Sequence, residues 1–279
     1  MNDMFGNEKV TLSNGTTIPV LGYGTWRNTD AKECVEGVKV ALELGYRHID
    51  TAQMYGNEAL VGEGMRLSGV PREEIYLTSK LNNSNHGYEN AVRTIDESLE
   101  KLGTDYMDLF LIHWPEVAGH EEDWAEDNIE TWRALEEAYE AGKLKAIGVS
   151  NFKVKHLENL LPNCRIKPMV NQIRLHPGVL QTETVAMSRE AGMAIEAWSP
   201  LSPIPQMVED DAIVKMAEKY KKSIAQLLLR YCLDKNYIPL TKSVHSERIK
   251  ENAEIFDFKL EQADLDYFDQ WEWQGDIFL

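Results

Sequence analysis

The chain has 279 residues, of which 29 are basic and 46 are acidic, so its formal net charge is −17. This charge repels a phosphate backbone and argues against nucleic-acid binding, and no apolar stretch reaches the roughly 18 residues that a membrane span needs. The length suits a single α/β barrel. We therefore expect residues 1–279 to form one domain and to act as a monomer with neither nucleic-acid nor membrane partners.

The N-terminus and the cysteines indicate a cellular location. The first ten residues lack the basic and apolar regions of a secretory signal, and Cys34, Cys164 and Cys232 are far apart in the sequence. An odd, scattered set of cysteines is typical of reduced thiols. We expect a cytoplasmic protein.

The first predicted element is a β-hairpin. Two short apolar runs flank the dipeptide Asn14-Gly15, which suits a type I′ turn because both residues tolerate a positive φ. We expect this N-terminal β-hairpin to form a lid on the fold that follows.

After the hairpin, apolar runs of strand length alternate with amphipathic helical windows. Eight strands are predicted, over residues 20–23, 46–50, 75–80, 107–113, 146–150, 169–173, 193–197 and 237–241. Strict alternation of strands and helices implies parallel strands, and eight such units close naturally into a (β/α)8 TIM barrel. The segment 199–205 is expected to be one loop of that barrel.

The helical windows carry their own signals. In residues 90–102, apolar side chains recur at helical spacing at Val92, Ile95, Leu99 and Leu102. Several helices are expected to end on a glycine in the left-handed conformation, namely Gly45, Gly103, Gly142 and Gly192. The tail beyond residue 258 is predicted as a last helix, with Leu265, Phe268 and Trp271 at helical spacing.

A doubly wound Rossmann-type sheet is the alternative fold. It would carry a G-x-G-x-x-G turn after its first strand. The two candidate segments, 22–24 and 62–64, both lack the third glycine. The sequence therefore favours the barrel.

Four polar residues fall at the ends of predicted strands or just after them: Asp50, Tyr55, Lys80 and His113. Each has an ordinary explanation by itself, as a turn cap, a half-buried aromatic, an ion-pair partner or a core histidine. A barrel, however, brings neighbouring strand ends together, so we expect the four to meet.

Together these side chains suit carbonyl reduction. Lys80 would lower the pKa of Tyr55 toward the working range of a general acid, and Asp50 would hold Lys80 in place. His113 would hydrogen-bond the carbonyl oxygen of a substrate. The set supplies a proton but no hydride, which a nicotinamide cofactor would carry.

Three segments, 45–58, 107–115 and 242–252, resemble the aldo-keto reductase family, and the similarity extends over residues 10–258. Within the family, the chain is most similar to bacterial members grouped with 2,5-diketogluconate reductases and glyoxal or methylglyoxal reductases. The resemblance implies NADPH-dependent reduction of aldehydes or ketones, such as small dicarbonyls or keto-sugars. It assigns the same four catalytic residues, with Tyr55 as the proton donor.

The resemblance also implies the NADPH contacts. Those to the nicotinamide are Ser150, Asn151, Gln172 and Trp198. Those to the pyrophosphate are Ser199 and Leu201. Those to the adenosine 2′-phosphate are Lys242, Ser243 and Arg248, and those to the adenine are Glu251 and Asn252.

The chain departs from the family pattern at two positions. Thr241 stands where the family commonly has proline, which alters the loop but not the cation at Lys242. Asn82 stands where many relatives carry tryptophan, so the substrate pocket is expected to be wider or more polar. Trp26 and Trp114 are the expected apolar walls of that pocket.

Two other functions fit parts of the sequence. Some proteins with this fold bind NADPH and regulate a channel, but the complete set of four polar residues argues against a purely regulatory protein. A metal-dependent barrel hydrolase is the second. No metal is expected, because the chain's histidines, among them His86, His113, His120 and His176, show no H-x-x-x-H spacing.

Overall fold

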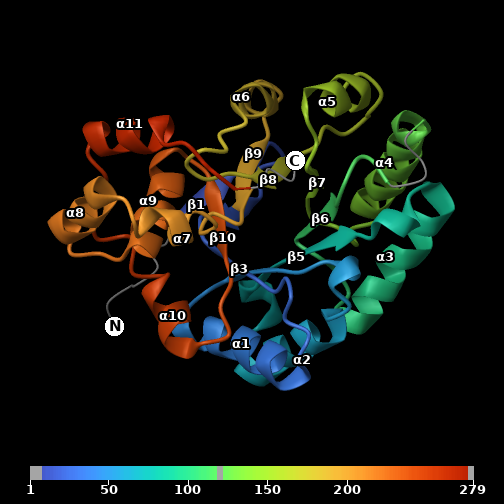
Figure 1. Ribbon diagram of the computed structural model, residues 1–279. Coiled ribbons are helices and arrows are strands. Elements are labelled where there is room, and N and C mark those ends of the chain that lie inside the picture. The colour runs from blue at the N-terminus through green and yellow to red at the C-terminus, as the bar shows by residue number, and fades with distance from the viewer. Residues whose placement is uncertain (1–7, 118–121, 276–279) are drawn as a thin grey trace.

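The computed structural model of the chain describes residues 8–117 and 122–275. Its strands are β1 (Lys9–Thr11), β2 (Thr17–Pro19), β3 (Gly22–Gly24), β4 (His48–Asp50), β5 (Tyr76–Leu81), β6 (Leu109–Ile112), β7 (Ile147–Ser150), β8 (Val170–Arg174), β9 (Ala194–Trp198) and β10 (Ile238–Thr241). Strands β3 to β10 close into a barrel in which neighbouring strands are parallel (Figure 1). Each of the eight predicted strands overlaps one of these, so the (β/α)8 prediction is confirmed.

Helices surround the barrel on its outer side (Figure 1). They are α1 (Ala31–Leu44), α2 (Glu58–Ser68), α3 (Tyr88–Leu102), α4 (Trp124–Glu140), α5 (Val154–Leu160), α6 (Thr182–Glu190), α7 (Ile204–Met207), α8 (Asp211–Tyr220), α9 (Ile224–Asp234), α10 (Ser246–Glu251) and α11 (Gln262–Gln270). The segment after β9 is not a plain loop, because the short helix α7 begins within it. Among the described residues, none of the helices combines the length and apolar character of a membrane span.

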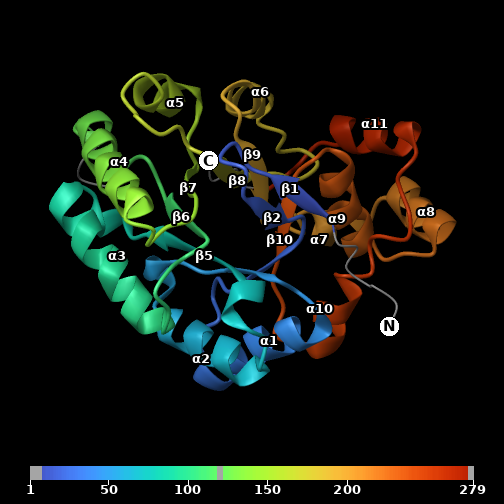
Figure 2. The same cartoon turned by 180° about the vertical axis from the view of Figure 1, so that it is seen from behind.

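The hairpin β1–β2 forms as predicted and lies over the barrel, as the reverse view shows (Figure 2). Its Asn14 Nδ2 donates to the carbonyl oxygen of Lys145 at 2.9 Å, just before β7, so the hairpin covers the N-terminal end of the strands. The predicted type I′ turn is wrong, because only Gly15 of the dipeptide has a positive φ, of 85°. The Asn14 side chain instead accepts from the backbone N–H of Thr16, which stabilises a longer turn.

Helix α3 shows how the outer layer packs. Its buried face includes Ala91, Ile95, Leu99 and Leu102, whereas Val92 is exposed. Val92 was expected on this face, but it lies at the edge of the apolar stripe, and the smaller Ala91 packs inward. The four glycines expected to follow helices all have a positive φ, as predicted.

Candidate active site

Three adjacent strands and one short turn bring the four predicted catalytic residues together. Asp50 is the last residue of β4, Lys80 lies near the end of β5, and His113 directly follows β6. Tyr55 closes a 3₁₀ turn, η1 (Gln53–Tyr55), in the loop after β4. Since β4, β5 and β6 are neighbours in the barrel, their C-terminal ends share one edge.

Lys80 and Asp50 form a buried ion pair. Lys80 Nζ donates to Asp50 Oδ1 at 2.7 Å and to the carbonyl oxygen of Thr51 at 2.8 Å. Burial disfavours the charge of Lys80, but Asp50, Tyr55 and Glu196 together outweigh that effect, so the pKa of Lys80 is raised. The ammonium group therefore stays charged inside the barrel.

Tyr55 lies between this ion pair and His113. The Lys80 ammonium is 5.2 Å from the centre of the Tyr55 ring, and the rings of Tyr55 and His113 meet edge to face at 5.7 Å. Burial raises the pKa of Tyr55, and the positive charge of Lys80 only opposes this rise. The expectation that Lys80 brings this pKa below its usual value is therefore wrong, because burial outweighs the attraction. Tyr55 holds its proton at neutral pH, as a proton donor must.

His113 is neutral at neutral pH. Burial, assisted by the nearby charge of Lys80, lowers the pKa of His113 well below its ordinary value. A neutral imidazole keeps one N–H group that can donate to an oxygen atom beside Tyr55. The role expected of His113 from the sequence would require such a donor.

The residues expected to contact the nicotinamide lie at the ends of β7 and β9 and in the middle of β8, and they are linked to one another. Asn151 Nδ2 donates to the carbonyl oxygen of His113 at 3.0 Å, and Trp198 Nε1 donates to Asn151 Oδ1 at 2.9 Å. Ser150 Oγ donates to the carbonyl oxygen of Gln172 at 2.8 Å. Gln172 in turn donates to Asp50 Oδ2 at 2.9 Å, which joins this group to the four catalytic candidates.

The residues expected to hold the rest of the cofactor follow β9 and β10. Ser199 comes directly after Trp198 with a φ of 53°, and Leu201 packs against the core. After β10, Ser243 is buried and Lys242 is exposed.

Helix α10 carries the last of these residues. Arg248 is exposed, whereas Asn252, directly after the helix, is buried. The backbone carbonyl of Glu251 accepts from Gln226. Within the described residues, neither Lys242 nor Arg248 is in an ion pair, although the chain carries an excess of carboxylates. Two such cations fit a phosphate group.

The expected substrate-pocket residues differ in their surroundings. Trp26 is 49% exposed, with the Arg27 guanidinium 4.3 Å from its ring centre. The ring of Trp114 meets that of Trp198 at 6.5 Å. Asn82 caps a short 3₁₀ turn by accepting from the backbone of Ser84, so its side chain has a local role besides any contact with substrate.

Sequence reasoning missed two buried polar residues beneath the site, His48 in β4 and Glu196 in β9. The sequence did contain a signal for Glu196, because a glutamate inside a predicted strand with apolar neighbours needs a partner. No comparable signal pointed to His48. Its ring faces the barrel interior only because the strand pairing turns it inward.

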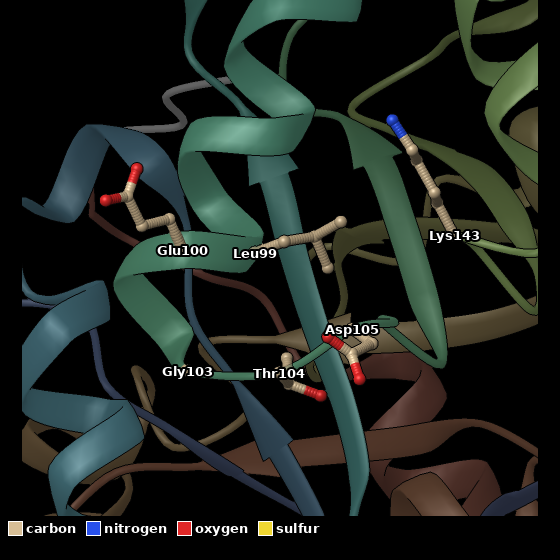
Figure 3. Close-up of a pocket in the computed structure, with 6 residues that line it drawn as sticks. All are labelled: Leu99, Glu100, Gly103, Thr104, Asp105 and Lys143. Atoms are coloured by element: carbon tan, nitrogen blue, oxygen red, sulfur yellow. The ribbon is translucent and has the colours of Figure 1, made fainter.

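A surface hollow lies beside the segments that lead into β6 and β7 (Figure 3). It is lined by Leu99, Glu100, Gly103, Thr104, Asp105 and Lys143. The segment 103–105 precedes β6 and Lys143 precedes β7, so the hollow borders the N-terminal ends of these strands. Enzymes with this barrel carry their chemistry at the other end.

The structure also bears on metal binding. Among residues 8–117 and 122–275, no three histidine, cysteine or carboxylate side chains gather as a metal site would require. His120, one of the histidines weighed in the sequence, lies outside the described residues.

A closed parallel barrel with these side chains at its strand ends defines a (β/α)8-barrel enzyme. The chain belongs to the Aldo/keto reductase family, whose model matches residues 20–203 and 206–272. It is 45% identical to a glyoxal reductase of Bacillus subtilis, over 94% of this chain and 92% of the relative. It is 40% identical to a morphine 6-dehydrogenase of Pseudomonas putida, over 94% of this chain and 90% of the relative.

Solved structures agree with this assignment. An aldo/keto reductase from Brucella melitensis superposes with a TM-score of 0.88 at 45% identity, over 94% of this chain and 97% of that one. An aldo-keto reductase of Bombyx mori in complex with NADP superposes with a TM-score of 0.87 at 36% identity, over 94% of this chain and 92% of that one. The protein is therefore an oxidoreductase of a family that uses NADPH, which confirms the enzyme class and cofactor predicted from the sequence.

Proposed function

We propose that the protein reduces small aldehydes or ketones, in particular dicarbonyls or keto-sugars, with NADPH as hydride donor and Tyr55 as general acid. The observation that carries this proposal is the protonated phenol of Tyr55 beside both the Lys80–Asp50 ion pair and the neutral His113. The named activity of the Bacillus subtilis relative supports the dicarbonyl class.

Each of the four side chains has a separate role in the proposed reaction. When bound, NADPH supplies the hydride that reaches the carbonyl carbon. His113 donates a hydrogen bond to the carbonyl oxygen and holds it next to the Tyr55 hydroxyl. Tyr55 gives that oxygen its proton, and the ammonium of Lys80 stabilises the phenolate left behind. Asp50 keeps Lys80 in place and charged.

The residues around these four fit NADPH. Ser150, Asn151 and Gln172 would hold the carboxamide of the nicotinamide against the ring of Trp198. Lys242 and Arg248, the unpaired cations described above, would hold the 2′-phosphate together with Ser243. Charge-assisted hydrogen bonds of this kind select the phosphorylated cofactor over NADH.

The decisive experiment measures consumption of each cofactor with a panel of carbonyl compounds, including methylglyoxal, glyoxal and a keto-sugar. We expect steady oxidation of NADPH with at least one dicarbonyl and much slower oxidation of NADH. A protein that binds NADPH tightly but consumes none with any carbonyl would instead be a regulatory NADPH-binding protein. A wild type that prefers NADH would contradict the cofactor assignment.

Three further expectations remain proposals. We propose that residues 1–279 act as one domain, since a single barrel contains all of the strands β3 to β10. We propose a monomer without nucleic-acid partners, in keeping with the charge of −17. A cytoplasmic location is supported by the three cysteines, none of which is in a disulfide.

A further inference from the structure

A carboxyl group with no role in the steps above is buried inside the barrel, beneath the site. Glu196 lies in β9, is 0% exposed, and pairs in register with Gln172 of the neighbouring strand β8. Side chains that alternate along parallel strands point into the barrel together, so Glu196 and Gln172 share one layer of its interior. His48 of β4 reaches the same layer from the opposite side.

Gln172 is held between two carboxyl groups. Its Nε2 donates to Asp50 Oδ2 at 2.9 Å and to Glu196 Oε2 at 2.8 Å. An amide nitrogen has two hydrogens, and both are used in these bonds. The amide oxygen, which accepts no hydrogen bond within the described residues, is therefore the atom of Gln172 left to accept one from a ligand.

The second oxygen of Glu196 faces His48. Glu196 Oε1 is 3.5 Å from His48 Nε2, which also lies 3.0 Å from Thr78 Oγ1. Burial, assisted by the negative charge of Asp50, raises the pKa of Glu196 to about 8. Burial and the positive charge of Lys80 lower the pKa of His48 to about 3. Both groups are thus neutral at pH 7, and Glu196 Oε1 forms no hydrogen bond within the described residues.

The strand β3 makes room for this arrangement. A Cβ atom at Gly22 would lie 2.8 Å from His48 Nδ1, so only glycine lets the ring occupy this position. The interior layer beneath Gln172 is therefore shaped by several strands at once, with a polar pair where most barrels of this type carry branched apolar side chains.

We propose that Glu196 is a positioning residue of the active site. It fixes the amide of Gln172 from below, so that the amide oxygen is presented to the carboxamide N–H of the nicotinamide. This inference rests on the proposed function, which assigns Gln172 to the cofactor. Without an acceptor at position 196, one N–H of Gln172 is left unpaired in a buried site, and the amide is free to turn.

The charge state of Glu196 has a second consequence. Groups from three strands face Glu196: His48 and Asp50 from β4, Tyr76 and Lys80 from β5, and Gln172 from β8. Gln172 is uncharged, and the residues of β10 that pair with β9 do not titrate. Loss of the Glu196 proton leaves an additional negative charge below the nicotinamide site. That charge favours the oxidised cofactor, whose ring is positive, over the reduced one.

The test measures the Kd of NADPH and of NADP⁺ by quenching of tryptophan fluorescence. Glu196→Leu removes the acceptor, and we expect NADPH binding to weaken about 3- to 12-fold, the loss of one hydrogen bond. Glu196→Gln keeps a neutral acceptor, and we expect a Kd within about twofold of wild type. Glu136→Leu, which removes a glutamate that is 3% exposed in the outer helix α4, is expected to lower Tm but leave the Kd unchanged.

A second measurement keeps the proposal testable if Glu196→Leu does not fold. In the wild type, the ratio of the Kd of NADPH to that of NADP⁺ should rise roughly tenfold between pH 7 and pH 9, and in Glu196→Gln it should stay flat. A folded Glu196→Leu with wild-type affinity, or the same rise in Glu196→Gln, would overturn the proposal. A wild type that binds NADPH but reduces no carbonyl would refute the proposed function alone, since these binding measurements need no turnover.

Discussion

Two opposing effects set the chemistry of Tyr55. Burial favours its neutral phenol, whereas Lys80 favours the phenolate, and in the free protein burial prevails. The phenol therefore stays protonated until a carbonyl oxygen arrives to take the proton. Lys80 acts mainly afterwards, when a negative charge has formed beside it.

The first prediction concerns this proton. Tyr55→Phe removes the hydroxyl and keeps the ring that packs against His113, so the fold and NADPH binding should be preserved. We expect kcat for carbonyl reduction to fall roughly 10²- to 10⁴-fold, the usual contribution of a general acid. Stopped-flow measurement of NADPH oxidation determines this kcat for the variant and the wild type. Near wild-type kcat in the variant would exclude Tyr55 as the acid.

A second prediction concerns Arg248. Arg248 is exposed. It follows Lys242 by six residues in the sequence and lies in α10, the helix after β10. A charge-assisted hydrogen bond contributes about 1.5–3 kcal/mol, so Arg248→Ala should raise the Kd for NADPH roughly 10- to 150-fold. NADH lacks the 2′-phosphate, and its Kd should change by less than about threefold. Equal losses for both cofactors in fluorescence titrations would show that Arg248 has only a structural role.

At the scale of elements, the short strand β3 has little room for a side chain at Gly22. Its two glycines differ in their surroundings. A Cβ at Gly22 would meet Leu240 at 2.5 Å and the His48 ring at 2.8 Å, whereas a Cβ at Gly24 would meet its nearest neighbour, the carbonyl oxygen of Thr241, at 3.4 Å. The same substitution to alanine should therefore affect stability differently at these two positions.

We expect Gly22→Ala to lower the free energy of unfolding by about 1–3 kcal/mol, because it overpacks the barrel interior. Gly24→Ala is the matched control in the same strand. It should be neutral or should raise stability by up to about 1 kcal/mol, since alanine restricts the unfolded chain. Urea unfolding followed by circular dichroism compares the two. Equal effects would mean that the close approach of His48 to β3 does not exist.

For the whole molecule, stability depends on the buried pair inside the barrel. Glu196 has a pKa of about 8 in the folded protein and an ordinary value of 4.5, so the folded state holds a proton that the unfolded chain has released between these values. Its contribution to stability is therefore lost as pH rises from 4.5 to 8. His48, with a folded pKa of about 3 against 6.5, acts in the opposite direction below pH 6.5.

Above pH 6.5 the effect of Glu196 is no longer opposed by that of His48. We expect the free energy of unfolding to fall by about 1–2 kcal/mol between pH 6.5 and pH 8, since each proton contributes about 1.4 kcal/mol per pH unit. Glu196→Gln should abolish this decline, and Glu136→Gln should retain it. Urea midpoints across the pH range measure the effect. A decline of equal size in Glu196→Gln would assign it to other groups.

The sequence by itself was sufficient to predict the barrel and the four catalytic candidates. Strand-length runs separated by amphipathic windows specify parallel strands, and parallel strands have their C-terminal ends on one face. Asp50, Lys80 and His113 could therefore be placed together from their positions at strand ends alone. The cofactor residues could not be assigned from strand positions alone, because their assignment came from the resemblance to a family.

Other features were decided only by the tertiary structure. The net shift of the Tyr55 pKa depends on how deeply the ring is buried, and the exposure of Val92 depends on how α3 is rotated against the barrel. The pairing of Glu196 with His48 joins strands that are far apart in the sequence and face each other across the barrel. Local patterns determine which residues form each strand, whereas burial and contacts across the interior arise only when all the strands have closed around them.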